Sequence, residues 1–314
     1  MMDLCSVSAV KRLLSENSLS PRKSLGQNFL INARIPEMIA ESSSEFARKS
    51  ISNNVPIGVI EIGPGIGALT DELANYFDRV VSVEIDPGLS LLFKKTFAGY
   101  NNVELISADI LKTDIPALVS DCFNDVVSEG GNVSVCANLP YYITTPVIMK
   151  LLESFGPTVK NPLSSVTVMI QSEVADRLCA QPGSSDYGSI TASVRLRANV
   201  VKLFDVSPGS FYPPPKVNST VIRIIPHGGI REVFPGAPDD NTECRKFFEL
   251  TSKIIEASFS QRRKTLTNSL SGLFPKDKTA SALVKIGKNP DVRGERLSTE
   301  DFCALTHMLL TEKE

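Results

Sequence analysis

Hydrophobic residues in the first two-thirds of the chain alternate between two patterns. Short β-branched apolar runs, typical of buried strands, are followed by stretches with apolar residues at helical spacing. Residues 55–62 form the first such run, and Leu69, Leu73 and Phe77 give residues 68–77 a helical apolar face. Further strands are predicted at residues 79–85, 103–108, 132–137 and 166–170, and further helices at residues 145–153 and 173–180.

This order of elements predicts the fold class. Strands that alternate with helices form a mainly parallel sheet that is covered by helices on both faces, so we expect an α/β fold. Two later strands, at residues 200–206 and 219–225, flank a proline-rich loop. We expect them to pair antiparallel at one edge, which brings the sheet to seven strands. Ligands of such sheets bind at the carboxyl ends of the strands.

The periodic pattern is interrupted once, late in the chain. Residues 227–241 contain Gly, Pro and Asp without periodicity, and we place the domain boundary there. The expected domains are residues 1–230 and residues 241–314, and the second has helical patterns only. Within it, Ser298 to Asp301 precede an apolar-periodic run and resemble a helix start with a capping box.

Composition limits the classes of function. The 314 residues are 42% hydrophobic, enough for a sizeable core, and no apolar run approaches the length of a membrane span. The N-terminus lacks the apolar core of a secretory signal, so we expect a cytoplasmic protein. The net charge of −2 argues against non-specific coating of nucleic acid. Local basic clusters can still bind RNA, although any one of them alone is usually a solvated face; they are Arg22-Lys23, Arg195 with Arg197 and Lys202, and Arg262-Arg263-Lys264.

Cysteine and histidine usage argues against two kinds of site. The six cysteines form no C-x-x-C pair, and the two histidines, His227 and His307, lie far from any cysteine cluster. We therefore expect no metal site and no histidine-dependent nucleophilic catalysis.

A glycine-rich turn follows the first strand. Residues 61–67 read Glu-Ile-Gly-Pro-Gly-Ile-Gly, so Gly63 opens a G-x-G-x-G spacing that is preceded by an acid. This differs from the dinucleotide fingerprint G-x-G-x-x-G. Glycines let the backbone turn tightly and pass close to a ligand. An acidic neighbour suits an amino-acid tail that carries a sulfonium, although the motif alone equally fits an ordinary strand–helix turn.

Two acids end the next two strands. Glu84 lies 21 residues after Gly63, where a carboxylate can accept hydrogen bonds from both ribose hydroxyls of a nucleoside. Asp109 follows the third strand, where an adenine amino group could donate to it. Either acid alone could be a solvated strand end. The three features in succession predict one nucleoside-shaped crevice.

The fourth strand ends in Asn138-Leu139-Pro140-Tyr141. The Asn138 side-chain oxygen and the Leu139 carbonyl can both accept from an exocyclic amine. Tyr141 offers a flat face for stacking a base. The alternative is a capped turn with a core tyrosine, and the other three motifs make it the weaker account.

Taken together, these motifs resemble the amino-group methyltransferases that act on adenine. The chain is most similar to the KsgA-type ribosomal RNA adenine dimethyltransferases, through residues 24–30, 181–188, 204–217 and 259–266. The resemblance runs from about Pro21 into the C-terminal domain. It implies a Rossmann-like methyltransferase fold with S-adenosylmethionine as cofactor and a small helical domain that binds RNA.

The resemblance also implies roles for individual residues. It assigns cofactor contacts to Asn28, Leu30, Gly63, Glu84, Asp109 and Asn138. The expected catalytic residues are Asn138, Leu139, Tyr141 and Phe211, with Tyr141 and Phe211 holding the target base. The implied reaction is dimethylation of the N6 amines of two adjacent adenosines in the 3′-terminal hairpin of 16S rRNA. The partner is the small-subunit rRNA in the 30S subunit or its precursor, with a role in subunit biogenesis, and we expect a monomer.

Three alternatives stay open. The large-subunit rRNA methyltransferases that confer macrolide resistance share Asn-Phe-Leu and Asn-Leu-Pro-Tyr, but residues 182–188 and 262–266 favour the small-subunit family. A methyltransferase fold that serves only as an assembly or transcription factor is disfavoured by the intact motif at residues 138–141. A nicotinamide-dependent oxidoreductase is disfavoured by the glycine spacing.

Overall fold

The computed structural model describes residues 4–22, 25–49, 51–52, 54–154, 163–261 and 263–311. They form two compact units. The described parts of residues 4–154, 163–175 and 201–225 make the first unit, and those of residues 176–200 and 226–311 make the second. No helix among the described residues combines the length and apolar character that crossing a membrane requires.

The division differs from the expected boundary, which assigned residues 1–230 to the first domain. Residues 176–200 belong to the second unit instead. The physical reason is hydrophobic packing, since Tyr187, Ala192 and Leu196 are buried in the same core cluster as Phe247 and Phe302. No break in the hydrophobic periodicity of the sequence indicates that residues 176–200 belong to the second unit.

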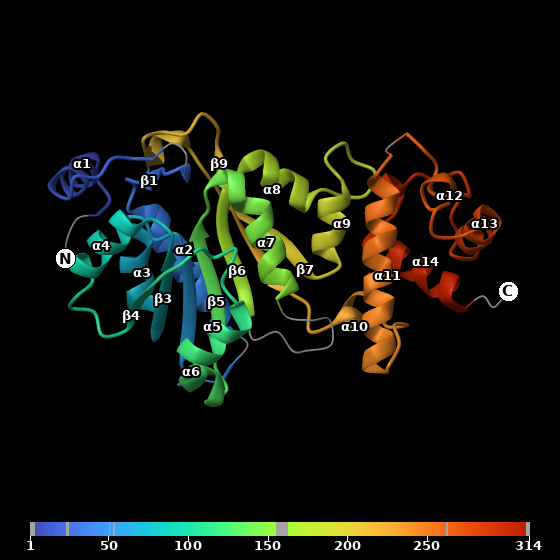
Figure 1. Ribbon diagram of the computed structural model, residues 1–314, viewed down its shortest axis with the longest axis horizontal. Coiled ribbons are helices and arrows are strands. Elements are labelled where there is room, and N and C mark those ends of the chain that lie inside the picture. Colours follow the sequence, from blue (N-terminus) through green and yellow to red (C-terminus); the bar gives the residue numbers. More distant parts are fainter. Residues whose placement is uncertain are drawn as a thin grey trace. The chain divides into compact units, whose positions relative to one another are not determined.

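A seven-stranded sheet forms the centre of the first unit (Figure 1). Its spatial order is β4 (Val103–Ser107), β3 (Arg79–Glu84), β2 (Ile57–Ile62), β5 (Asn132–Asn138), β6 (Leu163–Gln171), β9 (Ser219–Pro226) and β7 (Ala198–Val206). The first five strands run parallel, and β9 runs antiparallel to β6. The prediction of a mainly parallel sheet is confirmed, and the two later strands, β9 and β7, lie side by side at one edge of it, as expected.

The central strands are apolar on both faces because both faces are covered. All six residues of β2 are buried, as expected of a parallel strand between two helical layers. Helix α2 (Arg34–Lys49) packs on β5, β6 and α3 (Ala68–Tyr76). Other helices connect the strands: α4 (Pro87–Thr96), α5 (Ile115–Cys122), α6 (Asn124–Ser128), α7 (Thr144–Glu153) and α8 (Ser172–Cys179), whose last residues pass into the second unit.

The N-terminal residues add structure that the sequence patterns did not predict. Helix α1 (Val7–Glu16) is capped by Ser6, whose hydroxyl accepts from the Ala9 amide at 3.2 Å. It buries Val10, Leu13 and Leu14 in the first core. Strand β1 (Phe29–Leu30) then pairs antiparallel with β8 (Phe211–Tyr212). This pairing joins the start of the chain to the proline-rich loop.

The second unit is helical, as predicted. It contains α9 (Ser189–Arg195), α10 (Ile230–Val233), α11 (Asn241–Phe259), α12 (Leu266–Ser269), α13 (Lys276–Lys285) and α14 (Thr299–Thr311). The predicted capping box is confirmed, because Ser298 and Asp301 exchange hydrogen bonds of 3.0 and 3.1 Å between each backbone amide and the other side chain.

Candidate active site

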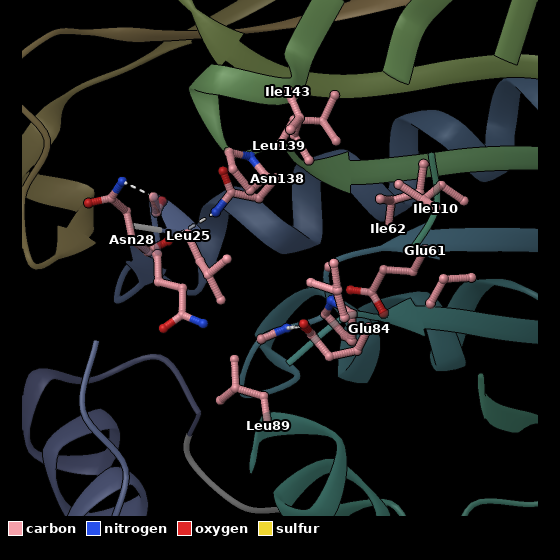
Figure 2. Close-up of a pocket in the computed structure, with 18 of the residues that line it drawn as sticks. Leu25, Asn28, Glu61, Ile62, Glu84, Leu89, Ile110, Asn138, Leu139 and Ile143 are labelled. Atoms are coloured by element: carbon pink, nitrogen blue, oxygen red, sulfur yellow. Dashed lines mark hydrogen bonds between the residues drawn. The ribbon is translucent and has the colours of Figure 1, made fainter. Parts of the chain in front are cut away.

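A cavity of about 270 Å³ opens at the carboxyl ends of the parallel strands (Figure 2). Its walls are residues 25–30, 61–66, 83–85, 108–111 and 138–143, with Ala68, Leu69 and Leu89. Eight of the nine predicted site residues line it: Asn28, Leu30, Gly63, Glu84, Asp109, Asn138, Leu139 and Tyr141. The structure therefore brings together, in one cavity, motifs that are far apart in sequence.

The glycine-rich turn after β2 has the backbone conformation that its sequence requires. Gly63, Gly65 and Gly67 have φ values of +68°, +61° and +95°, a region that side chains with a Cβ rarely adopt. A Cβ on Gly67 would lie 2.3 Å from the Phe97 ring, whereas one on Gly63 would meet no atom within 4 Å. The absence of a side chain at Gly67 thus allows the Phe97 ring to pack against the start of α3. At Gly63 it leaves the backbone of the cavity wall accessible to a ligand.

Glu84 at the end of β3 is buried, with 6% of its surface exposed. Its Oε1 accepts from the Asp86 amide at 2.8 Å, and its Oε2 accepts from the Gly65 amide at 3.4 Å. Burial raises the pKa of the carboxyl, and the two backbone amides oppose that effect. These bonds hold the carboxylate at the cavity wall, where its remaining lone pairs can accept from a diol.

Glu61 is the most buried acid of the cavity, at 1% exposure. Thr70 and Ser82 donate to its Oε2 at 2.6 and 2.7 Å, whereas its Oε1 has no hydrogen-bond partner among the described residues. Burial raises the pKa of this carboxyl to about 7. A buried oxygen without a partner fits a ligand that donates to it, and an ammonium group beside a sulfonium would do so.

Asp109 lies just beyond β4. Its Oδ1 accepts from the Leu111 amide at 3.0 Å, and its Oδ2 lies 4.0 Å from Lys112 Nζ. The side chain is about a quarter exposed. Next to it, the buried Ile110 supplies an apolar surface of the cavity. An apolar wall next to an acceptor suits a purine with an amino edge.

Asn138 ends β5 and faces the segment that precedes β1. Its Nδ2 donates to the backbone oxygen of Asn28 at 3.1 Å, and the Asn28 side chain in turn donates to the Gly26 carbonyl at 3.1 Å (Figure 2). Because the amide nitrogen is engaged, the amide orientation is set by this bond. The Asn138 Oδ1 is then the atom that can accept from a substrate amine.

The turn after Asn138 is tied to its surroundings. The Leu139 amide donates to the Met169 carbonyl at 3.2 Å, and the Leu139 side chain is buried. The Tyr141 hydroxyl bonds to Ser219 Oγ at 3.0 Å, which links this turn to the start of β9. The Tyr141 ring therefore has a defined position at the cavity.

Two aromatic residues lie differently from what the sequence predicts. Phe211, expected to hold the target base with Tyr141, is only 3% exposed, pairs with Leu30 and does not line the cavity. Tyr142, which the sequence analysis did not single out, does line it and is 58% exposed. The doubled tyrosine at residues 141–142 was the signal that could have found it.

Comparisons with known proteins agree on one family. Residues 18–310 match the model of the ribosomal RNA adenine dimethylase family. Proteins named ribosomal RNA small subunit methyltransferase A from Bacillus cereus and Bacillus mycoides are 40% identical to the chain, over 100% of it and 99% of their own length.

Two solved structures have the same fold. A dimethyladenosine transferase from Plasmodium falciparum has a TM-score of 0.64 and 26% identity, and the match covers 88% of this chain and 95% of that one. The 23S rRNA methyltransferase ErmE has a TM-score of 0.64 at 22% identity, with 90% and 100% covered. At that identity the second match shows the fold alone.

Proposed function

Because the chain belongs to the ribosomal RNA adenine dimethylase family, we propose that it transfers methyl groups from S-adenosylmethionine to the N6 amines of two adjacent adenosines in the 3′-terminal hairpin of 16S rRNA. Family membership confirms the resemblance found in the sequence and, with it, an S-adenosylmethionine-dependent rRNA methyltransferase. The choice of small-subunit rRNA, in the 30S subunit or its precursor, rests on the names of the relatives. The bond between Asn138 and Asn28 is the observation that carries the proposed chemistry.

The residues of the cavity fit the cofactor, which supplies an electrophilic methyl group when bound. Glu84 would accept from the ribose hydroxyls and Asp109 from the adenine amine. The Gly63 turn allows close approach of the amino-acid tail, whose ammonium would donate to Oε1 of Glu61. Asn28 and Leu30 would cover the cofactor from the segment before and within β1.

Asn138 and the Leu139 carbonyl act on the nucleophile. The adenine N6 lone pair is delocalised into the ring and attacks poorly. Two acceptors for the N6–H bonds stabilise the charge that builds on nitrogen in the transition state. A neutral amide suits this position, because an ionised acid beside the sulfonium would also stabilise the ground state.

Stacking would hold the target base. The Tyr141 ring is fixed by the bond to Ser219, and base–aromatic stacking contributes about 1–3 kcal/mol per base. The exposed Tyr142 offers a second face at the cavity. A role for Phe211 stays a prediction from the family resemblance, because its ring is buried and does not line the cavity.

Several cations of the basic clusters contact other groups of the protein. Arg22 pairs with Asp86, Arg195 donates to the Cys179 carbonyl, and Arg197 lies over the Phe248 ring. Arg263 and Lys264, after α11, are exposed, whereas Lys23 and Arg262 lie outside the described residues. We therefore assign the main rRNA phosphate contacts of the helical domain to Arg263 and Lys264. We also propose that the enzyme acts as a monomer in the cytoplasm.

Substrate choice provides the test. The protein is incubated with labelled S-adenosylmethionine and, separately, with small and large ribosomal subunits that lack the dimethyl mark. The rRNA is then digested and the nucleosides are identified. Dimethyladenosine in small-subunit rRNA alone supports the proposal. Transfer to large-subunit rRNA alone would favour the resistance-type activity, and no transfer despite cofactor binding would favour a non-catalytic assembly factor.

A further inference from the structure

Asp86 is a buried acid that lies outside the cavity wall yet contacts it from two sides. Its side chain is 3% exposed, and it follows Glu84 by two residues. Oδ1 caps α4 by accepting from the Gly88 and Leu89 amides at 2.9 and 3.4 Å. Oδ2 accepts from Gln27 Nε2 at 3.1 Å and lies 3.3 Å from Arg22 Nη1. The two oxygens thus have separate partners.

One partner of Oδ2, Gln27, belongs to the stretch that supplies one wall of the cavity. Gln27 precedes Asn28, and all of residues 25–30 line the cavity. Gln27 Oε1 accepts from the Arg22 amide at 2.8 Å, which sets the orientation of its amide so that Nε2 faces Asp86. A hydrogen bond to an ionised acceptor is about twice as strong as one between neutral groups.

Asp86 also contacts the other wall. Its backbone amide donates to Glu84 Oε1, the acid at the end of β3. On the far side of Gln27, the Asn28 carbonyl accepts from Asn138. A continuous path of bonds therefore runs from Glu84 through Asp86 and the Gln27–Asn28 stretch to Asn138.

We propose that Asp86 is a positioning residue for the cofactor site. It holds residues 25–30 in the place where Asn28 and Leu30 cover the cofactor and where the Asn28 carbonyl orients Asn138. This inference rests on the proposed function, because it assumes that the cavity binds S-adenosylmethionine. Asp86 itself touches neither the cofactor nor the substrate.

The competing explanation is that Asp86 serves only as the N-cap of α4. The two explanations can be separated because Oδ1 caps the helix, whereas Oδ2 contacts Gln27 and Arg22. Asn caps helices as well as Asp does, so Asp86→Asn keeps an acceptor for Gly88 and Leu89. The same change turns an NH₂ group toward Gln27 Nε2 and Arg22, so that donor faces donor. If Asp86 positions residues 25–30, this variant should bind S-adenosylmethionine more weakly. If Asp86 only caps α4, the affinity should be unchanged.

A second substitution should repair the first. Gln27→Glu places an acceptor opposite the new amide at position 86, and its other oxygen can still accept from the Arg22 amide. The double variant therefore restores a complementary pair with donor and acceptor exchanged. A merely structural role of Asp86 would not predict this rescue.

The experiment measures the affinity and dissociation rate of tritiated S-adenosylmethionine on the full chain, without RNA, together with the melting temperature. Glu37→Gln is the matched control, since Glu37 pairs with Arg34 on the surface. We expect Asp86→Asn to weaken binding about tenfold, mainly through faster dissociation. The melting temperature should stay close to that of the control, and the double variant should recover most of the affinity.

Two results would overturn the proposal: unchanged binding by Asp86→Asn, or a double variant no better than the single one. If Asp86→Asn does not fold, Gln27→Ala removes the donor to Oδ2, together with the acceptor of the Arg22 amide, and leaves the cap intact. This variant should weaken binding, and unchanged binding would refute the proposal. The proposed function can fail without affecting this test. A protein that binds S-adenosylmethionine but methylates no small-subunit rRNA would refute the proposed substrate, and the role of Asp86 could still be measured by cofactor binding. A native chain that binds no S-adenosylmethionine would refute both.

Discussion

Asn138 Nδ2 donates to the backbone oxygen of Asn28 across 110 residues of sequence, at 3.1 Å. This one bond joins the end of β5 to the segment before β1 and decides which end of the Asn138 amide can face a substrate. It also links the segment proposed to cover the cofactor to Asn138, the proposed acceptor of the substrate amine.

Replacing Asn138 by Asp should abolish the donor as well as alter the charge. A carboxylate cannot donate to the Asn28 carbonyl, so two acceptors would face each other at the site of the present bond. We expect Asn138→Asp to lower the rate of methyl transfer by about 100-fold or more. The measurement is single-turnover transfer at saturating cofactor, and a rate within a few-fold of the native enzyme would contradict the assigned role.

The titration of Glu61 should shape the pH dependence of cofactor binding. Burial raises the pKa of this carboxyl to about 7, and only its ionised form attracts an ammonium strongly. The affinity for S-adenosylmethionine should therefore rise as the pH increases through about 7. It should fall again above about 8, where an α-amino group loses its proton. Calorimetric titration of native protein and Glu61→Gln tests this, since the variant should lose the rising limb.

The same group should affect the stability of the ligand-free protein in the opposite sense. The folded-state pKa of Glu61 lies above the ordinary glutamate value of 4.5, so folding favours the protonated form. Its contribution to stability is complete below about pH 4.5 and is lost as the pH rises to about 7. Relative to Glu61→Gln, the native protein should melt progressively lower between pH 5 and 8. A parallel pH dependence in the two proteins would refute the assignment.

Tyr141 should contribute through its ring more than through its hydroxyl. Tyr141→Phe keeps the stacking face and loses only the bond to Ser219, so a small effect is expected. Tyr141→Ala should lower kcat/KM for the rRNA by about 10- to 100-fold, which corresponds to the stacking energy of one base. Cofactor affinity should be unchanged in both variants. Equal defects in the two would argue for a structural role of the hydroxyl.

Gly63 and Gly67 should respond differently to alanine. At Gly67 the new Cβ would lie 2.3 Å from the Phe97 ring, so we expect Gly67→Ala to destabilise the fold by about 2 kcal/mol or more. At Gly63 no atom lies within 4 Å, and only the left-handed backbone is strained, which costs about 1 kcal/mol. Denaturant unfolding measures both, and Gly67→Ala should be the less stable variant.

The site residues at the ends of the strands can be predicted from the sequence because each is recognised from its immediate sequence neighbours. Gly63, Glu84, Asp109 and Asn138 each follow a strand whose pattern is clear, and parallel strands bring their carboxyl ends to one edge. That logic was enough to predict the sheet and the cavity. The family match then confirmed the resemblance drawn from the same motifs.

What the sequence did not reveal depends on contacts between distant segments. The β1–β8 pair is two residues long on each side, too short to give a strand pattern, and it buries Phe211. Asp86 looks like a strand end followed by a proline, and only the fold shows that Gln27 donates to it. The assignment of residues 176–200 to the second unit likewise depends on the burial of Tyr187 and Leu196 in the core of that unit.

The role of Asn138 in methyl transfer is measured by comparing native protein with Asn138→Ala on small ribosomal subunits that lack the dimethyl mark. Each protein is given a saturating concentration of cofactor. Nucleosides are identified after digestion of the rRNA. We expect the native protein to form dimethyladenosine, and the rate of its formation to be lower by about 100-fold or more in the variant, which should still bind the cofactor. Dimethyladenosine formed at a similar rate by Asn138→Ala would contradict this role of Asn138.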